Sequence, residues 1–208
     1  MRIRRRPGVL KELKKLPGFL LPGEQWQWEK ANPLYVELGM GKGKFITSLA
    51  YQKPEINFVG IEKVPEIIYQ AGKRVPAGLP NLRFLLSDVT QIDEYFQPGE
   101  ISRIYLNFSD PWPKNRHAHR RLTSPFFLKL YRDLLVLGGA IHFKTDCVDF
   151  FEYSLRQFSQ IGFSVEKITY DLHNSGYKAN ILTEYELKFM AQGVPICRCE
   201  AIKMEGKS

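Results

Sequence analysis

The sequence predicts an α/β fold built around a mostly parallel sheet, and three observations support this. The chain has 208 residues, of which 44% are hydrophobic, which is enough for one sizeable core. From residue 34 onward, short apolar runs alternate with stretches of helical character, as in successive βαβ units. Four acidic residues that end or follow apolar runs are 25, 26 and 22 residues apart: Glu37, Glu62, Asp88 and Asp110. Each gap matches one βα repeat, so we expect all four carboxylates at the same edge of the sheet.

The elements can be placed in order along the chain. Strands are expected at residues 34–37, 57–61, 82–86, 104–108 and 140–144. Helices are expected at residues 44–51 and 65–74, with Pro65 in a first turn, and then up to about residues 135 and 160. Thr123 or Ser124 is the expected cap of the third helix, and Asp146 of the fourth. Two last strands, 164–172 and 185–190, are expected to form an antiparallel hairpin.

The charge is unevenly distributed. The net charge is +8, and residues 1–15 hold seven basic residues and one acid. A second cluster, residues 114–121, holds four basic residues and no acid. Localised positive charge of this kind favours a polyanionic partner. We interpret residues 1–33, which contain four prolines, as a basic N-terminal arm and residues 34–208 as a single domain. The alternative for the arm is a disordered, solvated tail.

Gly39, Gly41 and Gly43 follow the first expected strand and precede the first expected helix. Glycines at such a turn allow a ligand to approach the backbone closely. The G-x-G-x-G spacing differs from the G-x-G-x-x-G pattern of dinucleotide-binding proteins, because residue 44 is a lysine, and no P-loop pattern is present. A glycine-rich turn alone could be purely structural.

The acids near these glycines narrow the choice of ligand. An acid after the second strand, here Glu62, can accept hydrogen bonds from both ribose hydroxyls. Asp88, after the third strand, can take the exocyclic amine of adenine, and Glu37 can attract a cation. Any single acid could instead be a helix cap or a solvated strand end. Together they describe a site for an adenosyl group with a positive charge, which is S-adenosylmethionine.

The segment 107–116, Asn-Phe-Ser-Asp-Pro-Trp-Pro-Lys-Asn-Arg, places a carboxylate and a tryptophan beside basic residues, directly after the fourth strand. Trp112 either stacks on a base or is a core or rim residue held between two prolines. The basic residues either contact phosphates or form a solvated loop. His117 and His119 have no evident third ligand, and the Cys197-x-Cys199 pair is expected on alternating faces of a strand, so no metal site is predicted.

These motifs resemble those of the tRNA (guanine-N7-)-methyltransferase family. The matching motifs are E-L-G-x-G-x-G, G-I-E, S-D, N-F-S-D-P-W-P-K-x-R-H, H-F-K-T-D and T-E-Y-E, within residues 34–190. The resemblance implies a class I S-adenosylmethionine-dependent methyltransferase (Rossmann-like) fold, with a seven-stranded, mostly parallel sheet whose last strand is antiparallel. It also implies methyl transfer from S-adenosylmethionine to N7 of guanosine 46 in the tRNA variable loop.

The resemblance also implies residue roles. Asp110 is the expected catalytic residue. The expected cofactor-binding residues are Glu37, Gly39, Gly41, Gly43, Glu62, Asp88 and Asp110. The expected substrate-binding residues are Lys114, Arg116, His117, His119, Arg120, Arg121, Asp146, Thr183, Glu184, Tyr185 and Glu186. Asp146 and Glu186 would accept hydrogen bonds from the guanine edge, although Asp146 could equally cap a helix and Thr183 and Tyr185 could be ordinary strand residues.

Composition argues against membrane, secreted and disulfide-rich proteins. No apolar run approaches the length of a membrane span, and the N-terminus is too charged for a secretory signal. Three cysteines, an odd number, favour a reducing cytoplasm over a disulfide framework. We expect a monomer or homodimer whose partner is tRNA. The rival interpretations are a non-catalytic RNA-binding module and a methyltransferase for a protein or a small molecule; the glycine spacing disfavours a dehydrogenase.

Overall fold

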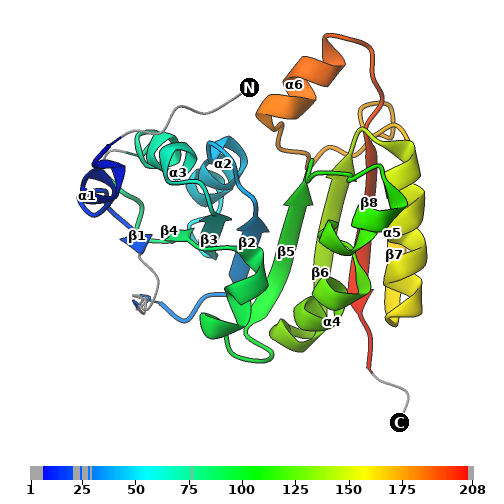
Figure 1. The fold of residues 1–208 in the computed structure, drawn as a ribbon, viewed down its shortest axis with the longest axis horizontal. Coiled ribbons are helices and arrows are strands. Elements are labelled where there is room, and N and C mark those ends of the chain that lie inside the picture. The colour runs from blue at the N-terminus through cyan, green and yellow to red at the C-terminus, as the bar shows by residue number, and fades with distance from the viewer. Residues whose placement is uncertain (1–6, 21–23, 25–27, 29, 76, 206–208) are drawn as a thin grey trace. The chain divides into compact units, whose positions relative to one another are not determined.

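The structure of the protein is a computed structural model that describes residues 7–20, 24, 28, 30–75 and 77–205 (Figure 1). The chain forms two compact units, residues 1–95 and residues 96–208. Within the predicted arm, residues 1–6, 21–23, 25–27 and 29 lie outside the described residues, among them Arg2, Arg4, Arg5, Arg6 and Trp26. The division into an arm and one following domain stays a prediction.

The first unit alternates strands and helices. Its strands are β1 (Phe19–Leu20), β2 (Leu34–Leu38), β3 (Asn57–Glu62) and β4 (Leu82–Leu86). Its helices are α1 (Val9–Leu13), α2 (Lys44–Gln52), α3 (Pro65–Gly72) and the 3₁₀ helix η1 (Val89–Glu94). The strands pair in parallel in the order β1-β4-β3-β2. β3 is buried along its whole length, as expected for a central parallel strand.

Part of the expected arm is packed onto this unit. Val9 and Leu13 of α1 are buried, and β1 pairs in parallel with β4. The amide of Phe84 donates to the carbonyl of Gly18 at 2.7 Å. Two apolar side chains and a strand register therefore attach residues 9–20 to the first unit.

The second unit begins with β5 (Ile101–Asn107), the 3₁₀ helix η2 (Asn115–Arg120), α4 (Pro125–Leu134) and β6 (Leu135–Thr145). It continues with α5 (Val148–Gln160), β7 (Phe163–Thr169), α6 (Glu184–Met190) and β8 (Cys197–Lys203). The strand order is β5-β6-β8-β7, in which β5 and β6 are parallel and β8 is antiparallel to both of its neighbours. The last strand is therefore antiparallel, as predicted.

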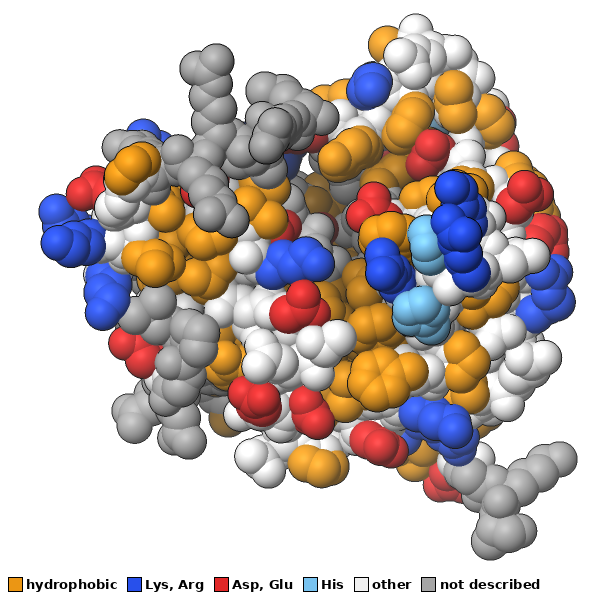
Figure 2. All heavy atoms as spheres, in the orientation of Figure 1, with side chains coloured by type: hydrophobic (Ala, Val, Ile, Leu, Met, Phe, Trp, Pro, Cys, Tyr) orange, Lys and Arg blue, Asp and Glu red, His pale blue; other side chains and the backbone are white. Residues whose placement is uncertain are grey.

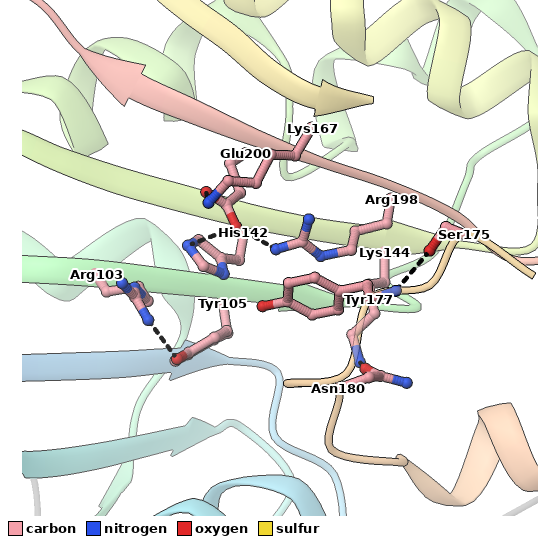
Figure 3. A network of polar contacts seen from close by, with 10 residues as sticks. All are labelled: Arg103, Tyr105, His142, Lys144, Lys167, Ser175, Tyr177, Asn180, Arg198 and Glu200. Atoms are coloured by element: carbon pink, nitrogen blue, oxygen red, sulfur yellow. Dashed lines mark hydrogen bonds and ion pairs between the residues drawn. The ribbon is translucent and has the colours of Figure 1, made fainter. Parts of the chain in front are cut away.

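The two faces of β6 differ in chemistry. Phe143 points into an aromatic core, with ring centroids 5.2 Å from Phe150 and 6.0 Å from Phe151 of α5. His142 and Lys144, on the opposite face, join a polar network with residues of β5, β7 and β8 (Figure 3). Because side chains alternate along a strand, β6 presents an apolar face that α5 covers and an opposite, polar face that extends to the carboxyl end of the strand.

Most expected elements are confirmed, and four expectations are corrected. The predicted strand at 185–190 is wrong, because these residues form α6, and the last strand is β8 instead. Eight strands are described rather than seven, the additional one being the two-residue β1. Asp146 does not cap α5, whose N-cap is Cys147, and Ser124, the N-cap of α4, makes no side-chain capping bond. Cys197 and Cys199 lie on β8, as expected, and are free thiols. Among the described residues, no helix has the length and apolarity needed to cross a membrane.

Candidate functional site

The glycine-rich loop of the first unit has its backbone in the left-handed region at all three glycines. The φ angles of Gly39, Gly41 and Gly43 are 72°, 56° and 71°. A Cβ on Gly43 would lie 2.7 Å from Cβ of Ala71, so this glycine lets α2 pack closely against α3. A Cβ on Gly39 or Gly41 would meet no atom within 4 Å. Those two glycines are therefore needed for conformation alone, and the space beside them is open to a ligand.

Glu62 holds this loop in place. Its Oε2 accepts a hydrogen bond from the amide of Gly41 at 3.2 Å, and its Oε1 accepts from the amides of Lys63 and Val64 at 2.9 and 3.0 Å. A carboxylate has about four lone-pair positions, so acceptor capacity remains for a ligand hydroxyl. Glu62 thus connects the end of β3 to the glycine-rich loop and still suits the ribose role predicted for it.

Asp88 follows β4 and caps η1. Its Oδ1 accepts from the amide and the hydroxyl of Thr90 at 3.0 and 2.9 Å, and Lys63 Nζ lies 3.4 Å from Oδ2. Partial burial alone would raise the pKa of Asp88, but the Thr90 hydrogen bonds and the Lys63 charge outweigh it and hold the pKa below its usual value. Asp88 is therefore an anion at neutral pH.

The strand registers bring the predicted acids of the first unit to one edge. Glu37 pairs with Gly60 near the end of β2, and Glu62 pairs with Leu86 at the end of β4. Glu37 is 2% exposed. Open glycines, a loop-bound carboxylate and two further acids suit an adenosyl ligand with a cationic centre. Asp110, the fourth acid, belongs to the second unit and is described with it.

In the second unit the chain turns sharply after β5. Phe108 and Trp112 both have positive φ, 53° and 41°, which is unusual for residues other than glycine. The amide of Phe108 donates to the carbonyl of Lys144 at 2.9 Å. Between these two residues, Asp110 is exposed. The turn thus presents the predicted catalytic carboxylate on a strained backbone fixed to the end of β6.

A basic surface follows this turn. Lys114, Arg116, His119 and Arg120 are exposed, whereas His117 is half-buried. The Arg120 guanidinium lies over the Trp112 ring, 5.0 Å from its centroid, and His117 meets the same ring edge-on at 5.8 Å. Figure 2 shows basic side chains gathered around histidines on this face of the second unit. Trp112 is therefore a half-buried support for the basic residues around it, which favours the rim interpretation of this tryptophan.

Arg121 differs from its neighbours because it is only 8% exposed. Its Nε donates to the carbonyl of Pro111 at 2.9 Å and its Nη2 to the carbonyl of Trp112 at 3.0 Å. Its guanidinium also lies 4.3 Å from the centroid of the Tyr153 ring. Two of its N–H groups are therefore used by backbone carbonyls, which gives Arg121 a structural role in this turn, and a phosphate contact by Arg121 stays a prediction.

The segment predicted to bind substrate near the C-terminus is a capped helix. Thr183 Oγ1 accepts from the amide of Glu186 at 3.0 Å, and Glu186 Oε2 accepts from the amide of Thr183 at 2.9 Å. This is a capping box. Its T-x-x-E pattern is a helix signal in the sequence, which the expected strand at 185–190 left unused. Glu184 and Tyr185 are exposed, whereas Thr183 and Glu186 are buried. Asp146 lies just beyond β6 and is half-buried.

Glu186 has an internal counter-ion that the sequence analysis missed. Its Oε2 lies 2.9 Å from Nζ of Lys144, and its Oε1 accepts from Nδ2 of Asn180 at 2.8 Å. Burial alone would raise the pKa of Glu186, but the Lys144 charge and these hydrogen bonds hold it below its usual value. The polar alternation of β6, with His142 and Lys144 on one face, was the only local signal for this partner.

Comparisons with known proteins agree with this geometry. Residues 31–199 match a family model described as "Putative methyltransferase". The tRNA (guanine-N(7)-)-methyltransferase of Listeria monocytogenes serotype 4a is 45% identical over 97% of this chain and 98% of its own length. That of Geobacillus kaustophilus is 44% identical over the whole length of both chains. The chain belongs to the tRNA (guanine-N7-)-methyltransferase family.

Solved structures confirm the fold class of this family member. The 16S rRNA methyltransferase KamB superposes with a TM-score of 0.63 at 12% identity, covering 89% of this chain and 98% of its own. A structure titled as an antibiotic-related methyltransferase gives a TM-score of 0.61 at 18% identity, over 82% and 87% of the two chains. The protein is an α/β, S-adenosylmethionine-dependent methyltransferase of class I.

Proposed function

We propose that the protein methylates N7 of guanosine 46 in the variable loop of tRNA. The observation that carries the proposal is the turn after β5, where an exposed Asp110 is followed within ten residues by exposed Lys114, Arg116 and Arg120. An acid beside a basic surface suits a reaction that generates a cationic base on a polyanion. Membership of the family and the names of its relatives support tRNA as the substrate.

In this proposal the first unit holds the cofactor. The backbone of Gly39 and Gly41 borders the open space beside the loop, Glu62 accepts hydrogen bonds from the ribose, and Asp88 accepts one from the adenine amine. Glu37 supplies negative charge near the cationic centre, and Gly43 keeps α2 against α3. When bound, S-adenosylmethionine supplies an activated methyl group on a sulfonium.

The chemistry at guanine makes few demands on the protein. N7 carries an in-plane lone pair and no proton, so its attack requires no general base. The residues of this chain need only hold the base in line and exclude competing water, and orientation of that kind can supply much of the rate enhancement. Methylation leaves the guanine cationic, so we assign Asp110 to electrostatic stabilisation of the charge that develops on the base. No cysteine is needed for a covalent intermediate.

Substrate binding is assigned to groups that the second unit exposes. Lys114, Arg116, His119 and Arg120 would contact phosphates or sugars, and His117 would complete this surface beside Trp112. Asp146, Glu184 and Tyr185 would contact the target base or its neighbours. Thr183 and Glu186 would act by shaping α6, because both are buried within its capping box.

Transfer of labelled methyl from S-adenosylmethionine to unmodified tRNA tests the proposal. The controls are one transcript with 7-deazaguanosine in place of guanosine and one with adenosine at position 46. Label on the normal transcript and on neither control would support the proposal. Label on the adenosine-46 transcript would show that a nucleotide other than position 46 is methylated. Equal label on the deaza transcript would show that an atom other than N7 is methylated.

Two outcomes would support the rival classes. Cofactor binding without transfer to tRNA would favour a binding module. Transfer to another acceptor that tRNA does not compete with would favour a protein or small-molecule substrate.

A further inference from the structure

Glu186 is not presented to a guanine in the conformation described, because its carboxylate is buried and already accepts three internal hydrogen bonds. The residue is 0% exposed. Oε2 contacts both Lys144 Nζ and the amide of Thr183 at 2.9 Å, and Oε1 accepts from Asn180 at 2.8 Å. Lys144 Nζ in turn donates to Glu186, to Oδ1 of Asn180 at 3.0 Å and to the carbonyl of Ile181 at 3.2 Å. Three ammonium hydrogens thus meet three acceptors.

Lys144 is also attached to the turn that carries Asp110. Its carbonyl accepts the amide hydrogen of Phe108 at 2.9 Å, and its partner in the β5–β6 register is Asn107, the last residue of β5. One residue therefore fixes the end of β5 through its backbone and α6 through its side chain.

The turn also contacts α6 directly, through Phe108. Phe108 stacks on two aromatic side chains of α6, with centroid distances of 5.8 Å to both and interplanar angles of 20° to Tyr185 and 27° to Phe189. Phe108 has a φ of 53°, a conformation that costs energy for a residue with a large side chain and persists only when its surroundings enforce it. The two stacked rings and the hydrogen bond to Lys144 are contacts that enforce it.

We propose that Lys144 and Glu186 are positioning residues, whose buried ion pair holds α6 against Phe108 and thereby sets the geometry of the Asp110 turn. The proposal rests on the function proposed for Asp110. It departs from the expectation that Glu186 contacts the guanine, because it assigns the loss of activity in a Glu186 variant to a displaced turn. Figure 3 shows Lys144 beside Asn180, whose amide also donates to Glu186.

A single tryptophan can report the position of the turn without substrate. The chain has three tryptophans, and replacing Trp26 and Trp28 by phenylalanine leaves Trp112, two residues after Asp110, as the only emitter. In this background we would compare Lys144→Met, Glu186→Gln, the double variant and Phe108→Leu. Phe108→Leu leaves the ion pair intact and removes the stacking, so it tests the link if the ion-pair variants fold poorly.

Glu200→Gln is the matched control. Glu200 is another buried glutamate of the second unit. Its Oε2 lies 2.8 Å from Nζ of Lys167, and its Oε1 contacts Arg198 and lies 3.7 Å from Nε2 of His142, so the substitution weakens several contacts of a buried acid on β8 and none of those described above for α6. For each variant we would measure kcat and KM for tRNA, the affinity for S-adenosylhomocysteine, and acrylamide quenching of Trp112. Circular dichroism would verify folding.

We expect Lys144→Met, Glu186→Gln and Phe108→Leu each to lower kcat by about tenfold to a hundredfold, the scale of a misplaced reacting group. KM should change by less than about threefold, quenching of Trp112 should change in each, and the double variant should lose no more than the worse single variant, as coupled residues do. Glu200→Gln should leave kcat and quenching unchanged.

Three results would overturn the proposal. The first is a raised KM for Glu186→Gln with unchanged Trp112 quenching, which would indicate direct contact with the RNA. The second is multiplicative loss in the double variant, and the third is wild-type turnover in Phe108→Leu. If the unsubstituted enzyme fails to methylate tRNA, the proposed function fails, whereas the quenching comparison still decides whether the ion pair positions the turn.

Discussion

Asp110 lies three residues beyond the end of β5, on a turn flanked by two residues with positive φ. Its side chain is exposed, which leaves the carboxylate available to a ligand. The residues that hold the turn, Phe108 and Arg121, use contacts that do not involve the Asp110 side chain. The proposed catalytic group and the residues that hold the turn are therefore different, so a substitution can remove one without the other.

We predict that Asp110→Ala keeps the fold but lowers kcat by about a hundredfold or more, the usual cost of removing one preorganised electrostatic group. Labelled methyl transfer and thermal unfolding would measure the two effects. Asp149→Ala, which removes an exposed acid from α5, is the control and should retain activity. Near wild-type turnover by Asp110→Ala would remove this residue from the mechanism.

His142 gives a prediction about pH. Burial, followed by repulsion from Arg103, lowers the pKa of His142 to about 3 in the folded protein, below its ordinary 6.5. The unfolded chain therefore binds an extra proton first, so this residue's contribution to stability is complete above pH 6.5 and is lost as the pH falls toward 3.

Between pH 6.5 and 5 the free energy of unfolding should fall by up to about 1.4 kcal/mol per pH unit on account of His142. His142→Gln should flatten that slope when unfolding in urea is followed across this window. Burial alone would raise the pKa of Glu200, but hydrogen bonds and charges lower it to about 2. Its contribution to stability is therefore complete above its ordinary pKa of 4.5 and is lost only as the pH falls from there toward 2, below this window. An unchanged slope in His142→Gln would contradict the assignment.

At the scale of elements, the segment from β5 through η2 to Arg121 contains basic residues of two kinds, some exposed to solvent and one buried in the structure. Its exposed basic residues surround Trp112, whereas Arg121 is buried and binds the carbonyls of Pro111 and Trp112. The sequence indicates a basic cluster but does not distinguish these two kinds, because Arg120 and Arg121 are adjacent and chemically identical. Only the path of the turn decides which guanidinium meets solvent.

This difference predicts opposite behaviour for two adjacent substitutions. Arg120→Gln should weaken tRNA binding and lower the slope of log Kd against log salt by about one, the effect of losing one phosphate contact, with little change in stability. Arg121→Gln should lower the free energy of unfolding by about 2 kcal/mol and leave the salt slope unchanged, because it removes hydrogen bonds from a charged donor. A reduced salt slope in Arg121→Gln would mean that Arg121 reaches the RNA after all.

The helix α6 shows why a pattern of alternation can mislead. Tyr185, Leu187 and Phe189 alternate with polar residues, which predicts a strand. The structure instead buries Glu186 and exposes Tyr185 and Leu187, because Lys144 provides a counter-ion from β6, 42 residues earlier. The local capping box favours a helix, and the distant lysine makes burial of the acid tolerable.

At the scale of the whole molecule, each unit carries one part of the proposed chemistry. The first unit contains the glycine-rich loop, Glu62 and Asp88, and the second contains Asp110, the basic residues and α6. A ligand that binds the folded first unit must stabilise the native protein by mass action.

We therefore predict that S-adenosylhomocysteine, at about a hundred times its Kd, raises the free energy of unfolding by about 2.7 kcal/mol. Glu62→Gln should reduce this ligand-dependent gain, because it removes the negative acceptor proposed for the ribose and weakens the hold on Gly41. Glu55→Gln, at an exposed position of the same unit, should leave the gain unchanged. Equal gains in both variants, measured by thermal unfolding with and without ligand, would exclude Glu62 from the cofactor site.

The sequence by itself determined the order of most strands and helices, the acids at strand ends, the glycine-rich turn and the family motifs. These features depend on local periodicity and on residue types that one chemistry requires, and both can be read along the chain. Tertiary structure alone decided that Arg121 is internal, that Glu186 is buried against Lys144 and Asn180, and that Phe108 is stacked against α6. These outcomes depend on which partners the fold brings within a few ångströms, and spacing in the sequence carries no record of that distance.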